Sequence, residues 1–269
     1  MCLRDPGLLE KCIYALQLLG LLADSGMPFV FKGGTSMVLL LEHLRRLSID
    51  IDIVSETPGT VDLTFLRHLA KESQFVRVEE DERGTHRLPH RRHFKFYYNS
   101  AYASIDSYVM LDVLQERNLY PTTCRLPIRA SFIEAERVVD VTLPTVDALL
   151  ADKLTAFAPN TVGVRLTAEN NMQVIKQVVD VGELFTQATD LTLIRRTYAA
   201  ICAAEIGYRG GGLTQAMALD DTIETARRIS VIRLRGAPQD EATPLIDAGM
   251  KRMGNHLLGS FAMDDLKTA

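Results

Sequence analysis

Two aspartates two positions apart, Asp50 and Asp52, are the first residues of this chain whose spacing suggests chemistry. Isoleucines alternate with them at 49, 51 and 53, which predicts a strand over 49–54 with both carboxylates on one face. Two close like charges repel each other unless a cation lies between them, and Mg²⁺ takes carboxylate and phosphate oxygens. The pair is a candidate Mg²⁺ site, and the alternative is a solvated acidic strand face.

Asp112 is a second notable carboxylate, because it lies inside the apolar run 108–114. A lone carboxylate in a central strand is costly to bury unless it is paired or bound to a metal. As a third acid it would complete a site for two metals, or for one metal and a general base. The alternatives are that it faces solvent beside a helix or pairs with a basic residue.

A glycine-rich turn precedes the acidic pair. Gly33, Gly34, Thr35 and Ser36 follow a short apolar strand at 29–31. Paired glycines let the backbone approach a phosphate, while helix amides and the two hydroxyls donate to it. A plain tight turn, with Thr35 or Ser36 capping a helix to about Leu44, is the alternative. Phosphate donors beside metal ligands are what a nucleoside triphosphate (NTP) requires.

Two lysines in the C-terminal half extend this pattern. Lys153 falls on an apolar helix stripe, where a lysine either extends its amine to solvent or faces an anion. Lys176 and Asp180 are four positions apart on the next helix and share a face, which also suits a simple ion pair.

A basic segment, residues 83–95, stands out in a chain of net charge −4. Its cations fit the phosphate backbone of RNA, and a solvated basic loop is an equal alternative. They are Arg83, Arg87, Arg91, Arg92 and Lys95. The absence of Trp and a 7% aromatic content argue against an aromatic stacking platform for single strands.

The remaining pattern predicts two domains of an α/β (α+β) protein. Residues 1–140 mix helices with strands at 74–80, 93–98 and 108–114, which indicates an α/β domain with a mixed β-sheet. Residues 141–269 predict a helical bundle domain, with helices at 145–158, 170–187, 190–206, 215–233 and about 240–258. The apolar run 12–23 is too short to span a bilayer, so we expect a buried first helix, no membrane contact and a cytoplasmic protein. The four cysteines are far apart and predict neither disulfides nor a zinc site.

The order of these motifs resembles the nucleotidyltransferases of the DNA polymerase β superfamily, and among them the AbiEii/AbiGii-type toxins of bacterial type IV toxin–antitoxin systems. The resemblance covers residues 29–187 and rests on four segments: 32–36; Arg46-x-Ser48-x-Asp50-x-Asp52; 152–156; and Lys176 to Asp180 with 182–184. Asn160 stands where the family often carries an arginine.

By this resemblance, the glycine turn with Arg46, Ser48 and Lys176 would hold the NTP, and Asp50 and Asp52 would bind Mg²⁺. Lys153 would contact the nucleotide phosphates and Asp180 would complete the site. The implied activity is transfer of a nucleoside monophosphate to RNA, in some members the 3′ end of tRNA, which blocks translation. A cognate antitoxin is the implied protein partner. Two rivals remain open: a small-molecule nucleotidyltransferase of the antibiotic-modifying kind, and a nucleotide- or partner-binding module without turnover.

Overall fold

The computed structural model describes residues 5–57, 59–71, 73–82, 89–103, 106–130, 132–133, 137–232, 234–236 and 240–258. It forms two compact units, 1–145 and 146–269, so the boundary falls five residues after the one expected from the sequence. The first unit contains α1 (Pro6–Asp24), β1 (Val30–Lys32), α2 (Gly33–Leu40), β2 (Ile51–Val54), α3 (Leu63–Ala70), β3 (Phe75–Asp81), β4 (Arg91–Tyr98), β5 (Ser107–Leu114), β6 (Thr123–Pro127) and β7 (Asp140–Pro144).

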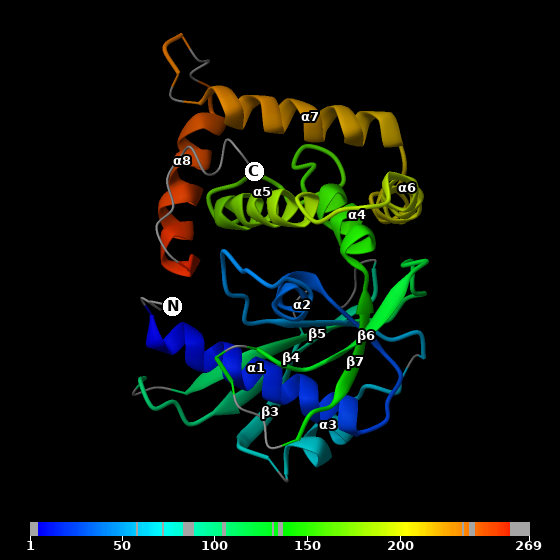
Figure 1. Cartoon of the computed structure of the whole chain (residues 1–269), viewed down its shortest axis with the longest axis vertical. Coiled ribbons are helices and arrows are strands. Elements are labelled where there is room, and N and C mark those ends of the chain that lie inside the picture. Colours follow the sequence, from blue (N-terminus) through cyan, green and yellow to red (C-terminus); the bar gives the residue numbers. More distant parts are fainter. Residues whose placement is uncertain are drawn as a thin grey trace. The chain divides into compact units, whose positions relative to one another are not determined.

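The main sheet of the first unit has the strand order β1-β2-β5-β4-β3 (Figure 1). Strands β2 and β5 are parallel, and the other neighbours are antiparallel. This mixed sheet confirms the expected α/β class. Strands β6 and β7 form a separate antiparallel pair that the sequence analysis missed. Both runs do alternate polar and apolar residues, but each strand is only five residues long and ends at a proline, Pro127 or Pro144.

One face of the sheet is buried and the other carries polar side chains. Along β4 and β5, buried residues alternate with half-buried or exposed ones, as period-two side-chain direction requires. Helix α1 packs on the buried face, where Tyr14 stacks on Tyr98 with ring centroids 3.7 Å apart. Each fully buried apolar side chain stabilises such a core by about 1.5–3 kcal/mol. The polar face is therefore left to carry the candidate chemistry.

Helix α1 begins where its sequence predicts. Asp5 accepts hydrogen bonds from the amides of Gly7 and Leu8, and Pro6 occupies the first turn. Among the described residues, α1 is the one helix with the length and composition to cross a membrane. Its apolar face is used for packing, since Cys12, Leu18 and other core residues are fully buried.

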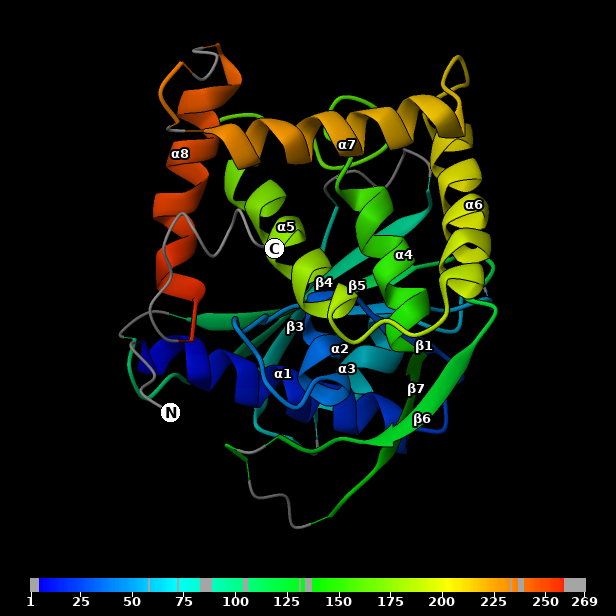
Figure 2. The same ribbon diagram turned by 45° about the horizontal axis from the view of Figure 1, so that its top comes forward.

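The described part of the second unit is helical. It contains α4 (Val146–Ala156), α5 (Asn171–Phe185), α6 (Leu191–Tyr208), α7 (Gln215–Val231), α8 (Ala242–Met253) and a short 3₁₀ turn, η1 (Gly254–His256). Helix α4 packs against α5 and α6, while α8 packs against α5 (Figure 2). A Cβ atom on Gly249 of α8 would lie 2.7 Å from the Asn171 carbonyl oxygen, so glycine permits this close helix contact.

Two local predictions near the acidic pair are wrong. Helix α2 begins at Gly33 after Lys32, with no side-chain cap, and it ends at Leu40 rather than near Leu44. Strand β2 begins at Ile51, so Asp50 lies immediately before the strand and Asp52 lies within it.

Candidate active site

The first glycine of the turn lies directly against Asp52. Gly33 has φ +78°, a left-handed conformation that favours glycine. A Cβ atom at this position would lie 2.1 Å from the Asp52 Oδ2 atom, far inside any allowed contact. Because residue 33 has no side chain, the Asp52 carboxylate can pack directly against the backbone of the turn.

The second glycine makes room for Arg46 and Ser48. A Cβ atom on Gly34 would lie 2.6 Å from the Arg46 guanidinium and 2.9 Å from the Ser48 hydroxyl. The Arg46 side chain is buried, and one guanidinium nitrogen donates to the Leu47 carbonyl at 3.3 Å. Both polar residues of the segment before the acidic pair thus pack on the glycine turn.

The two hydroxyls of the turn, on Thr35 and Ser36, donate hydrogen bonds to backbone carbonyls. Thr35 Oγ1 donates to the Asp50 carbonyl at 2.5 Å, and Ser36 Oγ donates to the Gly33 carbonyl at 2.7 Å. Neither side chain has any exposed surface. In this structure both hydroxyls hold Asp50 and Gly33 in place, and phosphate binding by the turn stays a prediction.

Strand register places five ionisable residues in one line across the polar face. Lys32 pairs with Asp52, Asp52 with Asp112, Asp112 with His93, and His93 with Asp81. Directly paired residues of neighbouring strands project from the same face of a sheet. Asp112, sixty positions from Asp52 in sequence, is thereby brought beside it.

Asp112 has a hydrogen-bond partner that the sequence analysis did not assign to it. His93 Nδ1 lies 2.7 Å from Asp112 Oδ1, and both side chains are partly exposed. This is the alternative of pairing with a basic residue. Among the described residues, no group of three or more His, Cys, Asp or Glu side chains is arranged to hold a metal ion. The expected three-carboxylate metal site is therefore not preassembled.

The donor chemistry of the acidic pair still fits Mg²⁺. This ion commonly uses one or two carboxylates together with waters and substrate phosphates. Asp50 and Asp52 are half-buried oxygen donors, and the Asp52 carboxylate occupies the space that a side chain at residue 33 would fill. Two carboxylates beside a glycine turn suit a magnesium ion that is also bound by a triphosphate, and they are too few for a site in which the protein supplies every ligand.

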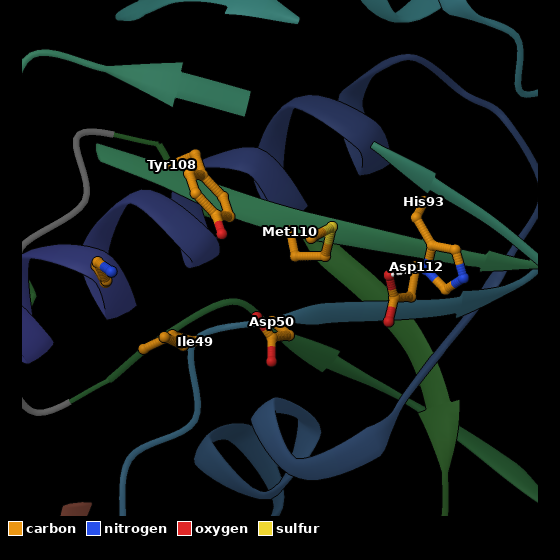
Figure 3. Close-up of a pocket in the computed structure, with 7 residues that line it drawn as sticks. Ile49, Asp50, His93, Tyr108, Met110 and Asp112 are labelled. Carbon is orange, nitrogen blue, oxygen red and sulfur yellow. Dashed lines mark hydrogen bonds and ion pairs between the residues drawn. The ribbon is translucent and has the colours of Figure 1, made fainter. Parts of the chain in front are cut away.

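A pocket of about 430 Å³ opens on the polar face beside these carboxylates. Figure 3 shows Asp50, Asp112 and His93 at one part of it, with Met110 and Tyr108 further along β5. Its lining residues are Lys11, Ile49, Asp50, His93, Tyr108, Met110 and Asp112. Four of these were not singled out as pocket residues from the sequence: Lys11, Ile49, Tyr108 and Met110. The period-two pattern of 108–112 was the one available signal for the two on β5.

Two charged candidates of the second unit, Lys153 and Asp180, form an ion pair with each other. Lys153 Nζ on α4 lies 2.7 Å from Asp180 Oδ2 on α5, and both side chains are buried. A lysine on an apolar stripe is thus explained by a buried partner on the next helix. Roles for Lys153, Asp180 and Lys176 in nucleotide binding stay predictions. Asn160, at the family's arginine position, donates to Asp221 through its amide and side chain.

In the described part of the basic segment, residues 89–95, two of the candidate cations for RNA binding are paired with carboxylates. Arg92 makes a bidentate pair with Glu80 at 2.7 Å and donates to the Val61 carbonyl. Lys95 pairs with Asp81 at 2.8 Å. Arg83 and Arg87 lie outside the described residues, while Arg91 is exposed. Arg92 and Lys95 are therefore committed to carboxylates of β3.

These ion pairs shift the protonation of their members. The hydrogen bond from Arg92 lowers the pKa of the Glu80 carboxyl, because it stabilises the charged form. The hydrogen bond to Asp81 raises the pKa of the Lys95 amine for the same reason. Both pairs are consequently charged at neutral pH and stabilise the β3–β4 edge of the sheet.

A mixed sheet with a glycine turn seated on an acidic strand pair defines a nucleotidyltransferase-type site. The chain matches the family described as nucleotidyl transferase AbiEii toxin, type IV toxin–antitoxin system, over residues 18–266. It therefore belongs to this family, whose place in a toxin–antitoxin system implies a cognate antitoxin. No curated protein matches the chain significantly in sequence.

Solved structures of similar proteins share little sequence with this chain. JHP933 from Helicobacter pylori is 13% identical with a TM-score of 0.42, and the match covers 93% of this chain and 97% of that one. An antigenic nucleotidyltransferase-like protein from Paracoccidioides brasiliensis is 15% identical with a TM-score of 0.45, covering 77% and 96%.

Proposed function

We propose that this protein transfers a nucleoside monophosphate from an NTP to an RNA acceptor, with Mg²⁺ at Asp50 and Asp52. The observation that carries the proposal is the contact between the Gly33 backbone and the Asp52 carboxylate. A turn that can bind phosphate and a carboxylate that can bind the accompanying cation meet there. The proposal does not depend on a catalytic role for Lys153 or Asp180.

The magnesium ion, when bound, neutralises charge on the phosphates and on the carboxylate pair. The chain's own residues supply the rest. The backbone amides of 33–36, together with Arg46 and Ser48, orient the triphosphate. Asp112 is the candidate proton acceptor for the attacking hydroxyl, and His93 holds its carboxylate through the 2.7 Å hydrogen bond. Catalysis of this kind depends mainly on positioning and charge stabilisation.

For the acceptor, we propose the 3′ end of tRNA, so that translation is inhibited in the cytoplasm and the antitoxin relieves the inhibition. Family membership supports a toxin role. Arg91 and the basic residues at 83 and 87 are candidate phosphate contacts. Arg92 and Lys95 drop out of this list because of their carboxylate partners.

The test is incubation of the whole protein with each labelled NTP and total tRNA, followed by electrophoresis and pyrophosphate detection. Wild type is expected to label RNA and Asp52→Asn to lose at least 100-fold of the activity. Asp24→Asn is the matched control, since its carboxylate pairs with the exposed Arg137 on the surface of the same unit. Equal labelling by wild type and Asp52→Asn would contradict the proposal.

Two other outcomes would identify a different function. Labelling of a cationic drug-like acceptor, with none on RNA, would assign the pocket carboxylates to small-molecule modification. Tight binding of Mg²⁺-NTP with no pyrophosphate release in any mixture would indicate a binding module without turnover.

A further inference from the structure

The glycine turn and the pocket lie on opposite sides of Asp52, while Asp50 and Asp112 line the pocket. The turn follows β1 at one edge of the sheet, and Asp52 and Asp112 are on the next two strands, β2 and β5. The pocket is formed by residues of β5 and β4 with Asp50, Ile49 and Lys11, and no residue of the turn lines it. Moving across the sheet from the turn therefore passes Asp52 before reaching the pocket.

Phosphoryl transfer uses an in-line geometry, with the attacking and leaving oxygens on opposite sides of phosphorus. If the turn holds the leaving pyrophosphate and the carboxylates flank the α-phosphate, the attacking hydroxyl must arrive from the pocket side. We propose that the pocket is the acceptor subsite and takes the terminal nucleoside of a single-stranded polynucleotide, with its base stacked on Tyr108. This inference rests on the proposed function and names where its acceptor binds.

The reaction at this subsite is balanced as follows. A bond forms between the acceptor oxygen and the α-phosphorus, and the bond from that phosphorus to the pyrophosphate oxygen breaks. The hydroxyl proton passes to the Asp112 carboxylate, and pyrophosphate leaves toward the glycine turn.

The pocket lining suits a nucleoside. Its volume of about 430 Å³ lies in the range of small-ligand pockets, about 300–1,000 Å³. Tyr108 is 39% exposed, so its ring is accessible for stacking. Met110 and Ile49 add apolar contacts, while Asp112 and Lys11 provide polar groups for ribose and phosphate. A flat aromatic face beside polar groups is the usual combination for a stacked base.

A second ring continues the stacking surface away from the carboxylates. Tyr97 is the register partner of Tyr108, and their ring centroids are 5.5 Å apart. The Arg77 guanidinium lies 4.0 Å from the Tyr97 ring centroid. The low aromatic content argued against a stacking platform, yet strand pairing places two tyrosines side by side. The two ring planes are 57° apart and Arg77 lies over Tyr97, so Tyr108 is the ring that offers a face to the terminal base.

The charges on this surface predict how it binds. Arg77 pairs with Glu79 and Asp106, and Lys95 pairs with Asp81. Their charges are already compensated, so few counterions are released on binding here. Stacking supplies the affinity, and the dependence of affinity on salt is shallow. With Lys11 as the cation of the pocket, the slope of log K against log salt is expected at about −1 or less steep.

The experiment measures binding of a 5′-fluorescein single-stranded RNA hexamer with a free 3′ hydroxyl to the full chain by fluorescence anisotropy. Tyr108→Ala is expected to weaken affinity by about 5- to 150-fold, the usual range for loss of one stacked base. Tyr108→Phe retains the ring and is expected to bind as wild type. Tyr102→Ala is the matched control, because Tyr102 is 67% exposed and lines no part of the pocket.

Unchanged affinity in Tyr108→Ala, or a salt slope of several units, would overturn the inference. Transfer of label to the hexamer is measured in parallel. Tyr108→Ala could bind the hexamer and transfer label to it as wild type does, while Asp52→Asn is inactive. In that case the acceptor binds elsewhere and the proposed function stands. If RNA binding depends on Tyr108 but wild type releases no pyrophosphate, the subsite is correct and the proposed function fails.

Discussion

Replacing Gly33 with alanine tests the contact on which the candidate site depends. In the structure the Gly33 backbone has φ +78°, and the position of its missing Cβ is 2.1 Å from Asp52 Oδ2 and 2.8 Å from Asp52 Cγ. The substitution adds one methyl group and no charge. Any effect on Asp52 must therefore come from the backbone conformation or from the clash.

The two contributions have different magnitudes. A non-glycine residue in the left-handed region costs about 1–3 kcal/mol of stability. Real Cβ atoms do not approach other atoms closer than 3.0 Å, so the Asp52 carboxylate must also withdraw by about 0.9 Å. A displacement near 1 Å at a reacting centre can lower the rate by about 100-fold. We expect Gly33→Ala to lose about 100-fold of transfer activity and more stability than conformational strain alone explains.

Gly26→Ala is the matched control for this prediction. Gly26 has φ +74° in the same unit, and a Cβ atom there meets nothing within 4 Å. It therefore carries the same conformational strain without the clash. The assays are urea denaturation for the free energy of unfolding and labelled-NTP transfer at a temperature where both variants are folded.

The reasoning is refuted if Gly33→Ala and Gly26→Ala lose the same stability and both keep wild-type activity. In that case the close approach of the turn to Asp52 has no consequence for the site. If Gly33→Ala loses extra stability while activity is unaffected, the contact is real but structural.

Three further predictions concern stability and reactivity. Lys153→Met removes the cation paired with the buried Asp180 and should lower the free energy of unfolding by about 3–5 kcal/mol in urea denaturation. Most of this loss should be recovered in the double variant Lys153→Met/Asp180→Leu. A loss below about 1 kcal/mol would contradict the stabilising role of the buried pair. Because the pKa of Glu80 is lowered in the folded state, its pair with Arg92 stabilises the protein above the carboxyl's ordinary pKa of 4.5, and this contribution disappears as the pH falls through the lowered value. The melting temperatures of wild type and Glu80→Gln should accordingly differ at neutral pH and converge in acid; a constant difference would be inconsistent with the pair. Burial raises the pKa of the Cys12 thiol to about 12, so the thiol of the folded protein should not react with an alkylating reagent at about pH 8. Peptide mapping should find Cys12 unmodified after alkylation of the folded protein and modified after alkylation of the unfolded protein.

Much of the local structure could be read from residue pattern. The apolar spacing of the C-terminal half predicted five helices, and α4 to α8 begin and end within a few residues of those ranges. Strands were also predicted at 74–80, at 93–98 and, from a nearly all-apolar run, at 108–114, and these correspond to β3, β4 and β5. Periodicity reports which face of an element is buried, and this information is local.

The candidate chemistry was read less completely. The acidic pair and the glycine turn were recognised together because they are close in sequence and their residue types are distinctive. Thr35 and Ser36 were assigned to phosphate binding, since no pattern shows that their hydroxyls turn inward to backbone carbonyls. His93 was not assigned to Asp112 from the sequence, because the two residues are nineteen positions apart.

Residue types and their short-range spacing thus specified which groups are available: a turn with two glycines, two carboxylates two positions apart, and a lysine on an apolar helix face. Pairing between distant segments specified what those groups do. Strand register placed Asp112 beside Asp52 and Tyr97 beside Tyr108, and helix packing placed Lys153 on Asp180. Register and packing depend on contacts between residues far apart in the chain, so no local window of sequence contains them.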